Sequence, residues 1–358
     1  MNFKTPFANA IKNCKGSFLF MITRKGRYTV VFSDGPKILS FASVAGPKEA
    51  QGPLSKKFDK IIYDPKAGKA TWEQAESQLQ KESLGLAISK AALHAEDIDF
   101  IFSGDLLNQC ISSSYGLKDF SIPYLGQYGA CSTMAQTLIM GAITLESGAA
   151  RLCACVTSSH FCSAERQYRF PLEYGGQRPP SAQWTVTGSG CCILGTGKGA
   201  NPVICGATVG RITDLGVTDA NNMGAAMAPA AAQTIVDFFS DTGKSPSDFD
   251  RIYTGDLGQV GSKLLYSLTE DAGLNIRDKH LDCGLLIFNR DLQDVHAGGS
   301  GCGCAASVLC SHILPQIKEE KLKDVLFIAT GALMSPTSCQ QGQSIPCVAH
   351  LVHISAGT

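Results

Sequence analysis

A cysteine in the segment Gly129-Ala130-Cys131-Ser132 is the residue of this chain best placed to do chemistry. The segment joins a predicted turn to a predicted helix, so Cys131 would stand at a helix N-terminus. Backbone N–H groups that lack helical partners at such an end stabilise a thiolate, and they can also hold an oxyanion or a ligand carboxylate. The same spacing equally suits a small residue packed where a helix approaches a sheet. Cys131 is therefore a candidate nucleophile or ligand contact, with simple packing as the alternative.

Glycine-rich turns could bring backbone close to a ligand at such a site. They comprise residues 187–190 with Gly188 and Ser189, residues 297–301, and residues 330–332 with Gly331 and Ala332. Glycine permits close approach of backbone to a ligand, but it equally permits close packing of two elements. None of these turns has the spacing of a dinucleotide fingerprint, and no Walker-type lysine follows. Nucleotide binding is thus disfavoured, and no cofactor is expected.

A polar and aromatic stretch, residues 158–170, follows a predicted buried strand. Ligands of α/β folds bind at the ends of parallel strands. Arg166, Arg169 and the later Arg178 could pair with a carboxylate in bidentate fashion, although arginines also form salt networks at subunit interfaces. His160, and His296 beside a glycine run, could act as bases or hydrogen-bond donors, whereas a lone histidine is more often structural.

Composition excludes several classes of protein. The chain has 358 residues, 44% hydrophobic and 17% charged, with 31 basic residues against 31 acidic ones. A nucleic acid is therefore not the expected main partner, because neutralising phosphates needs a basic excess. No apolar run approaches the roughly 20 residues that span a bilayer. The composition predicts an intracellular globular protein.

Cysteine usage points to packing. The 15 cysteines are an odd number, and most lie in apolar or glycine-rich segments. Free buried cysteine behaves as a small apolar residue, and the cytosol keeps thiols reduced. The pairs Cys153/Cys155 and Cys302/Cys304 have one residue between them, which is not the paired spacing of structural zinc ligands. No metal site is predicted.

An internal repeat organises the chain. Residues 96–106 align with residues 247–257, and both copies read as an acidic turn, an apolar strand and a Gly-Asp-Leu corner. The corners place Asp105 and Asp256 at equivalent positions. Two further blocks, beginning at Cys131 and at Cys304, align in the same order. The repeat predicts a duplicated α/β fold.

The expected elements alternate between helix and strand, which predicts parallel-rich sheets covered by helices. A capping box at Thr71 opens a helix to about Leu93, and Pro229 suits the first turn of another helix ending near Ser240. The remaining expected elements are strands at 100–103, 151–157, 252–254 and 325–329 and helices at 132–147 and 305–317. Residues 1–25 read as an N-terminal extension, 26–200 as the first half and 201–358 as the second.

These features together resemble the thiolase and β-ketoacyl synthase superfamily. Within it, the chain is similar to a family of sporulation proteins from endospore-forming bacteria, through strings such as SGDLLNQ, AERQYRFPLEYGGQRP, VTDANNMGAAMAPAAA and HAGGSGCGCAAS. The resemblance implies a thiolase-like fold of two pseudo-twofold-related halves in an α-β-α-β-α arrangement, and a homodimer. It implies binding of dipicolinic acid, as its calcium chelate, for uptake into the developing spore. It also implies a place at the spore inner membrane, beside membrane-embedded sporulation proteins of the same uptake system.

The superfamily's catalytic residues carry over only in part. Cys131 matches the nucleophile, which needs histidine or asparagine partners and an oxyanion hole. The partner positions hold Thr254-Gly255-Asp256-Leu257 and Gly301-Cys302-Gly303-Cys304, and the acidic Asp256 would oppose formation of a thiolate. We therefore expect a pocket without condensing activity. An acyltransferase using Cys131 with His160 or His296 is the alternative, and an assembly subunit with a vestigial pocket is a second.

A pocket for a flat aromatic dianion needs cationic or N–H donors and a flat slot. The predicted ligand-binding residues are Cys131, His160, Arg166, Arg169, Gly188, Ser189, Asp256, His296, Gly331 and Ala332. Asp105, Asn108 and Asp256 could instead hold the loops or meet the calcium. For Asp105 a structural role at the pseudo-twofold axis is favoured. The balanced charge assigns membrane association to protein partners.

Overall fold

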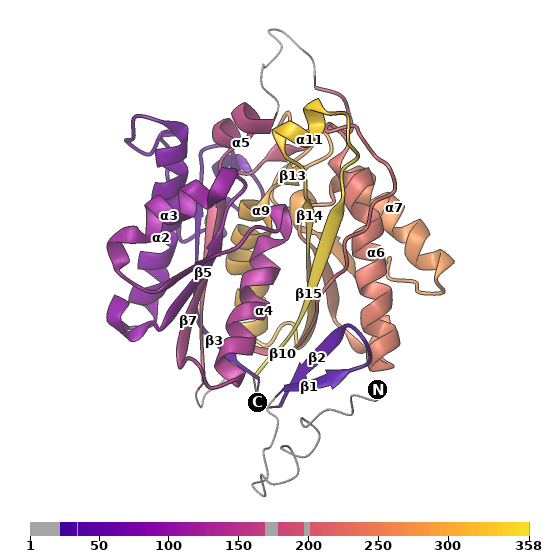
Figure 1. Cartoon of the computed structure of the whole chain (residues 1–358), viewed down its shortest axis with the longest axis horizontal. Helices are drawn as coiled ribbons and strands as arrows, with labels where there is room; N and C mark the ends of the chain where they lie inside the picture. The colour runs from indigo at the N-terminus through magenta and orange to yellow at the C-terminus, as the bar shows by residue number, and fades with distance from the viewer. Residues whose placement is uncertain (1–21, 34, 169–177, 197–200, 358) are drawn as a thin grey trace, which may run out of the picture.

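The structure is a computed structural model that describes residues 22–33, 35–168, 178–196 and 201–357. Two sheets, each built mainly from one half of the chain, lie with helices between them and on both outer sides (Figure 1). A single residue pair, Val203 with Lys37, connects the sheets. The predicted α/β fold with five layers is thus observed.

The first sheet runs in the order β3-β9-β7-β5-β6. β9 is antiparallel to both β3 and β7, whereas β7, β5 and β6 are parallel to one another. Its strands are β3 (Lys37–Ala45), β9 (Gly188–Gly195), β7 (Leu152–Ser159), β5 (Phe100–Gly104) and β6 (Tyr124–Gly126), with β4 (Lys60–Ile61) beside β3.

The second sheet repeats this order and these directions, as β10-β15-β14-β11-β12. The hairpin of β1 and β2 adds to it through pairing of β2 with β10. The strands are β10 (Val203–Thr208), β15 (Cys347–Ser355), β14 (Asp324–Ala332), β11 (Arg251–Thr254), β12 (His280–Asp282), β1 (Ile22–Lys25) and β2 (Thr29–Phe32). Two short strands, β8 (Trp184–Thr185) and β13 (Gly299–Ser300), pair separately.

Helices between the sheets are buried on nearly every side. α4 (Thr133–Glu146) contacts β5 and β7 of one sheet and β14 and β15 of the other, and α9 (Cys302–Val308) contacts β3, β7 and β9. An all-round apolar or small-residue helix is what such a position requires. The buried cysteines of α9 and β9 serve as small apolar residues in this packing. All cysteines of the described residues are free.

The outer helices bury one face, and that of α2 (Trp72–Lys90) includes the polar residues Glu76, Gln80 and Ser83. α2 begins at Thr71, whose side chain accepts a hydrogen bond from the Gln74 N–H at 3.3 Å. Together with α3 (Ile111–Leu117) it covers the first sheet. α6 (Met223–Thr242) and α7 (Gly258–Asp271) cover the second. The smaller helices are α5 (Phe161–Tyr168), α8 (Cys283–Leu286), α10 (Leu314–Lys318) and α11 (Pro336–Gln340).

Two helix predictions were wrong in detail. α6 begins at Met223, six residues before Pro229, because Asn222 caps it by accepting from the Ala225 N–H. The helix predicted over 305–317 begins at Cys302 and is broken into α9, a π turn at Leu309–Ile313 and α10. Pro315 explains the break, since it cannot donate to the preceding turn and a π turn accommodates the lost bond.

No helix among the described residues is long and apolar enough to cross a membrane. The predicted boundary near residue 200 falls partly at 197–200, outside the described residues. Residues 29–32, which the sequence places in the first half, pair with the second sheet.

Candidate functional site

Cys131 lies on a single helical turn, Ala130–Ser132, just before α4. Ala130 has a φ of 49°, a left-handed conformation that is strained for any residue with a Cβ. The turn is held by its neighbours: Ser132 Oγ donates to the Gly129 carbonyl, and Thr133 Oγ1 donates to the Ala130 carbonyl, both at 2.6 Å. This geometry points Cys131 into a cavity and not into the sheet.

The cavity at Cys131 is narrow, with a volume of about 50 Å³, and its walls are mostly apolar. Hydroxyl groups of Thr185 and Ser300 reach it, and so do the rings of Tyr128 and Tyr168. Among the described residues, no charged side chain lines it. Its apolar wall includes Leu106, Ala164, Met223, Met227, Ala332 and Met334.

Asp256 holds the loops behind Cys131 together. Its buried carboxylate accepts hydrogen bonds from the Gly301 N–H at 2.8 Å, from Thr330 Oγ1 at 2.7 Å and from Ser300 Oγ at 3.2 Å. These donors come from the start of α9 and from β14. The Cys131 thiol lies within the electrostatic influence of this carboxylate.

The electrostatics of the site disfavour a thiolate. Burial raises the pKa of the Cys131 thiol well above its ordinary value, and the charge of Asp256 raises it further. Burial also raises the pKa of Asp256, against the effect of its hydrogen bonds. The helix-end donors that could stabilise a thiolate are outweighed here. At neutral pH Cys131 is therefore a thiol.

Neither predicted histidine reaches the cavity. His160 Nε2 lies 2.8 Å from the Pro65 carbonyl, its ring packs on Trp72, and burial lowers its pKa. His296 Nε2 lies 2.9 Å from Asp294 Oδ1, on the exposed loop after α8. In the described part of the chain, Cys131 has no histidine partner.

The arginines lie outside this cavity. Arg166 forms an ion pair with Glu73 and borders two outer hollows on either side of α5. One of these hollows shares Tyr168 with the cavity wall. Arg178 pairs with Asp294. Arg169 falls in 169–177, outside the described residues.

The predicted glycine positions serve packing. A Cβ on Gly331 would stand 2.1 Å from the Gly129 carbonyl, so a glycine there lets β14 approach the Cys131 turn. Ala332, the next residue, lines the cavity. Gly188 and Ser189 lie buried in β9, where Ser189 Oγ donates to the Thr157 carbonyl. The structure thus brings together Cys131, Asp256, Gly331 and Ala332, and places His160, Arg166, Gly188, Ser189 and His296 elsewhere.

Sequence reasoning missed the aromatic and sulfur-containing wall. The hydroxyl groups of Tyr128 and Tyr168 lie 2.8 Å apart, and Tyr168 also donates to the Leu106 carbonyl. Met223 and Met227 project from the first turns of α6, and Met334 follows β14. Methionines are scarce in this chain, with seven in 358 residues. Met223 and Met227, four residues apart directly after Asn222, were the sequence signal that could have indicated this wall.

Comparison with known proteins identifies relatives at two distances. The family described as stage V sporulation protein AD matches residues 26–355. The stage V sporulation protein AD of Bacillus subtilis (strain 168) is 45% identical over 325 residues, which cover 91% of this chain and 96% of that protein.

Solved structures of condensing enzymes share the fold. The 3-oxoacyl-[acyl-carrier-protein] synthase III of Aquifex aeolicus VF5 superposes with a TM-score of 0.55 at 14% identity, covering 90% of this chain and all of that one. Xanthomonas campestris OleA with bound acetamide gives a TM-score of 0.57 at 12% identity, covering 90% of this chain and 98% of that one. The thiolase-like fold predicted from the sequence is confirmed by these likenesses.

Proposed function

The chain belongs to the stage V sporulation protein AD family, and from that membership we propose that it binds dipicolinic acid, as its calcium chelate, in the cavity at Cys131. The protein is a sporulation protein with a thiolase-like fold. Binding there would serve uptake of the chelate into the developing spore.

The observation that supports binding without turnover is the pairing of Cys131 with Asp256. A condensing enzyme needs a thiolate and a proton-accepting partner beside it. Here a buried carboxylate takes the neighbouring position, and the pKa of the thiol is raised well above its ordinary value. A cavity with a cysteine at the nucleophile position is kept, but the protonated thiol and the neighbouring carboxylate disfavour acyl transfer.

The lining favours the chelate over the free acid. Dipicolinate carries two negative charges at neutral pH, and burying them without a cationic partner is costly. Calcium cancels both charges, so the chelate is less costly to bury than the free dianion, and the cavity of about 50 Å³ would have to widen to admit it with its water ligands. Met223, Met227 and Met334 line the cavity, where their sulfur atoms would make favourable contacts with the pyridine ring.

The calcium would remain coordinated mainly by its ligand and by water. Calcium prefers roughly six to eight oxygen ligands. No group of three or more histidine, cysteine, aspartate or glutamate residues within the described segments is arranged to hold a metal ion. Asp256 already accepts bonds from Gly301, Ser300 and Thr330, which commits it to the loops.

Assembly is the second part of the proposal. β6 stands at the edge of the first sheet, paired with β5, and Tyr124 and Leu125 on it are exposed. An exposed edge strand is a template for pairing with another chain, so we propose a homodimer through β6. Membrane-embedded sporulation proteins of the same uptake system are the proposed partners, and the spore inner membrane is the proposed place.

Calorimetric titration of the full chain with dipicolinate, with and without calcium, tests the ligand. We expect saturable binding with calcium that picolinate, a pyridine monocarboxylate, does not match. Ala164→Leu fills the cavity and should weaken binding at least about tenfold, whereas Ala70→Leu, at an exposed site, should leave it unchanged.

Cys131→Ala separates binding from catalysis. Retained binding in this variant would show that the thiol is part of the wall. Absence of binding in the wild type, with or without calcium, would overturn the proposal. Rapid stoichiometric acylation of Cys131 by an acyl-CoA would favour the acyltransferase instead.

A further inference from the structure

The strands β6 and β1 both stand at an exposed edge, but their side chains differ in charge. β6 carries the exposed Tyr124 and Leu125, whereas β1 carries the exposed Thr23, Arg24 and Lys25. Within the described ranges, β1 pairs only with β2. The other side of β1 therefore presents backbone N–H and C=O groups that no described strand takes up, and such an edge is a template for one more strand.

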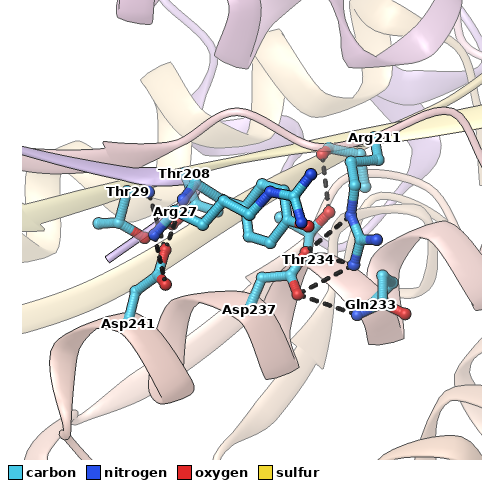
Figure 2. A network of polar contacts seen from close by, with 10 residues as sticks. Arg27, Thr29, Thr208, Arg211, Gln233, Thr234, Asp237 and Asp241 are labelled. Atoms are coloured by element: carbon cyan, nitrogen blue, oxygen red, sulfur yellow. Dashed lines mark hydrogen bonds and ion pairs between the residues drawn. The ribbon is translucent and has the colours of Figure 1, made fainter. Parts of the chain in front are cut away.

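Helix α6 holds the hairpin of β1 and β2 in place. Figure 2 shows Asp241 of this helix at the hairpin turn, where its carboxylate accepts the backbone N–H groups of residues 27–29 at 2.8–2.9 Å. Gly26 in the turn has a φ of 62°, and a Cβ there would stand 2.0 Å from Asp241 Oδ1, so this contact requires a glycine. Thr29 Oγ1 lies 2.8 Å from Thr208 Oγ1 of β10. The edge of β1 is thus formed before any partner arrives.

The hairpin carries three cations that no described carboxylate neutralises. Residues 1–33 contain six basic residues and no aspartate or glutamate. Arg24, Lys25 and Arg27 are the three of these six that lie within the described residues, and all three are exposed. Arg24 donates to the Arg27 carbonyl, and the Arg27 guanidinium lies 5.3 Å from the centre of the Tyr28 ring. In the part of the chain that the structure describes, none of the three cations forms an ion pair with a carboxylate.

The carboxylates of α6 near the hairpin are committed to other contacts (Figure 2). Asp241 is engaged with the backbone of the turn. Asp237, four residues earlier on the helix, accepts two-pronged contacts of 3.0–3.3 Å from Arg211 and a bond of 2.9 Å from Gln233. The positive charge of the hairpin is therefore left for a partner to neutralise.

This charge selects the kind of strand that can join β1. A second copy of β1 would bring its own cations opposite these, and like charges directly opposite one another destabilise a strand pair. Residues 1–21 contain three lysines and no acidic residue, so they offer no complementary charge either. β6, with the sequence Tyr-Leu-Gly, has no charged residue, and the homodimer proposed there meets no such repulsion. The edge of β1 thus suits an acidic strand from a different protein.

We propose that β1 accepts an extended acidic segment of a protein partner as an additional strand of the second sheet. Backbone hydrogen bonds would supply affinity, and carboxylates facing Arg24, Lys25 and Arg27 would supply selectivity. Successive side chains of a strand point to opposite faces, so Arg24 and Lys25 call for acidic residues at consecutive positions of the partner segment. Figure 1 places the hairpin at the opposite end of the molecule from α5 and α11, so this contact leaves the Cys131 cavity open.

Fluorescence anisotropy of a labelled peptide, Glu-Glu-Thr-Glu-Glu-Thr, with the full chain tests this without dipicolinate, so its outcome is independent of the ligand proposal. We expect saturable binding that weakens as salt is added, and no binding of the peptide in which lysine replaces glutamate. The acidic peptide N-methylated at every residue keeps its charge but cannot donate backbone hydrogen bonds. It should bind at least about tenfold more weakly.

Variants of the chain locate the contact. Arg24→Gln with Lys25→Gln and Arg27→Gln should weaken peptide binding about tenfold at an unchanged thermal unfolding temperature, because all three side chains are exposed. The matched control, Lys56→Gln with Lys69→Gln and Lys263→Gln, removes the same charge from exposed sites elsewhere and should bind as the wild type does.

Three results would overturn the proposal. They are absence of peptide binding by the wild type, equal loss of binding in the control variant, and equal affinity for the N-methylated peptide. Binding of the wild type to phosphatidylglycerol vesicles but not to the peptide would likewise overturn it, and would assign the three cations to a lipid surface.

Discussion

The two Gly-Asp-Leu corners of this protein have the same sequence and opposite relations to the cavity. Asp105 accepts from the Leu107 N–H and from the Ser113 N–H and Oγ, all within its own corner and α3. Asp256 accepts from the N-cap residue of α9 and from β14, and its charge acts on Cys131. One carboxylate closes a local turn, whereas the other ties distant segments around the cavity.

The difference shows how a duplicated fold can keep its symmetry in the backbone and break it in the side-chain contacts. Near Asp105, the buried Glu76 accepts from Ser158 and Ser163, and Gln80 connects Ser158 to Ser113. The Cys302 thiol donates to the Ser158 carbonyl at 2.9 Å beside this network, but Cys302 does not line the cavity. Of these two cysteines only Cys131 lines the cavity, and this difference makes the Asp256 corner part of a site.

Removing either carboxylate should cause the largest effect. Asp105→Ala and Asp256→Ala each leave three buried donors without an acceptor, and each unmet group costs about 1–3 kcal/mol. We expect each variant to lose about 3 kcal/mol or more of unfolding free energy in urea titrations. A loss in only one of them would show that the two corners are not energetically equivalent.

The first network should also impose a pH dependence on stability. Burial, with the charge of Asp105, raises the pKa of Glu76 from 4.5 to about 8. A carboxyl whose pKa is higher in the folded state stabilises the fold below its unfolded pKa, and this contribution is lost as pH rises through about 8. Glu76→Gln should therefore lose less stability than the wild type between pH 5 and pH 9, by an amount on the order of 3 kcal/mol.

Asp282 supplies the second-half control for this experiment. Burial raises its pKa only to about 6. Its stabilising contribution should fade between about pH 4 and pH 6, so Asp282→Asn should alter the pH profile only at the acidic end. A Glu76→Gln profile parallel to that of the wild type would mean that Glu76 does not titrate in this range.

The smallest predicted effect distinguishes the corners chemically. Asp256→Asn removes the negative charge beside Cys131, so alkylation of Cys131 by iodoacetamide at pH 8 should accelerate about tenfold. Asp105→Asn should leave that rate unchanged, because its contacts stay within its own corner. Peptide mass spectrometry at matched thermal stability measures both, and equal rates in the two variants would contradict the assignment.

Local sequence patterns predicted helices and strands correctly where residues close in sequence decide the secondary structure. Thr71 predicts the start of α2, and the apolar run after Arg151 predicts β7. The predicted helix bounds were wrong at α6 because the Asn222 side chain caps that helix ahead of Pro229. They were wrong after α9 because Pro315 has no N–H to donate within the helix. For the site, sequence selected Cys131 and Asp256 but could not choose among the histidines and arginines.

Sequence by itself determined the repeat, the family, the helix-end position of Cys131 and the basic, acid-free start of the chain. Only the tertiary structure decided that Asp256 stands beside Cys131, that His160 and Arg166 face other partners, and that three methionines complete the wall. The reason is physical. Periodicity and capping act over a few residues, whereas burial, charge proximity and the shape of a cavity depend on segments that meet only when the two halves pack together.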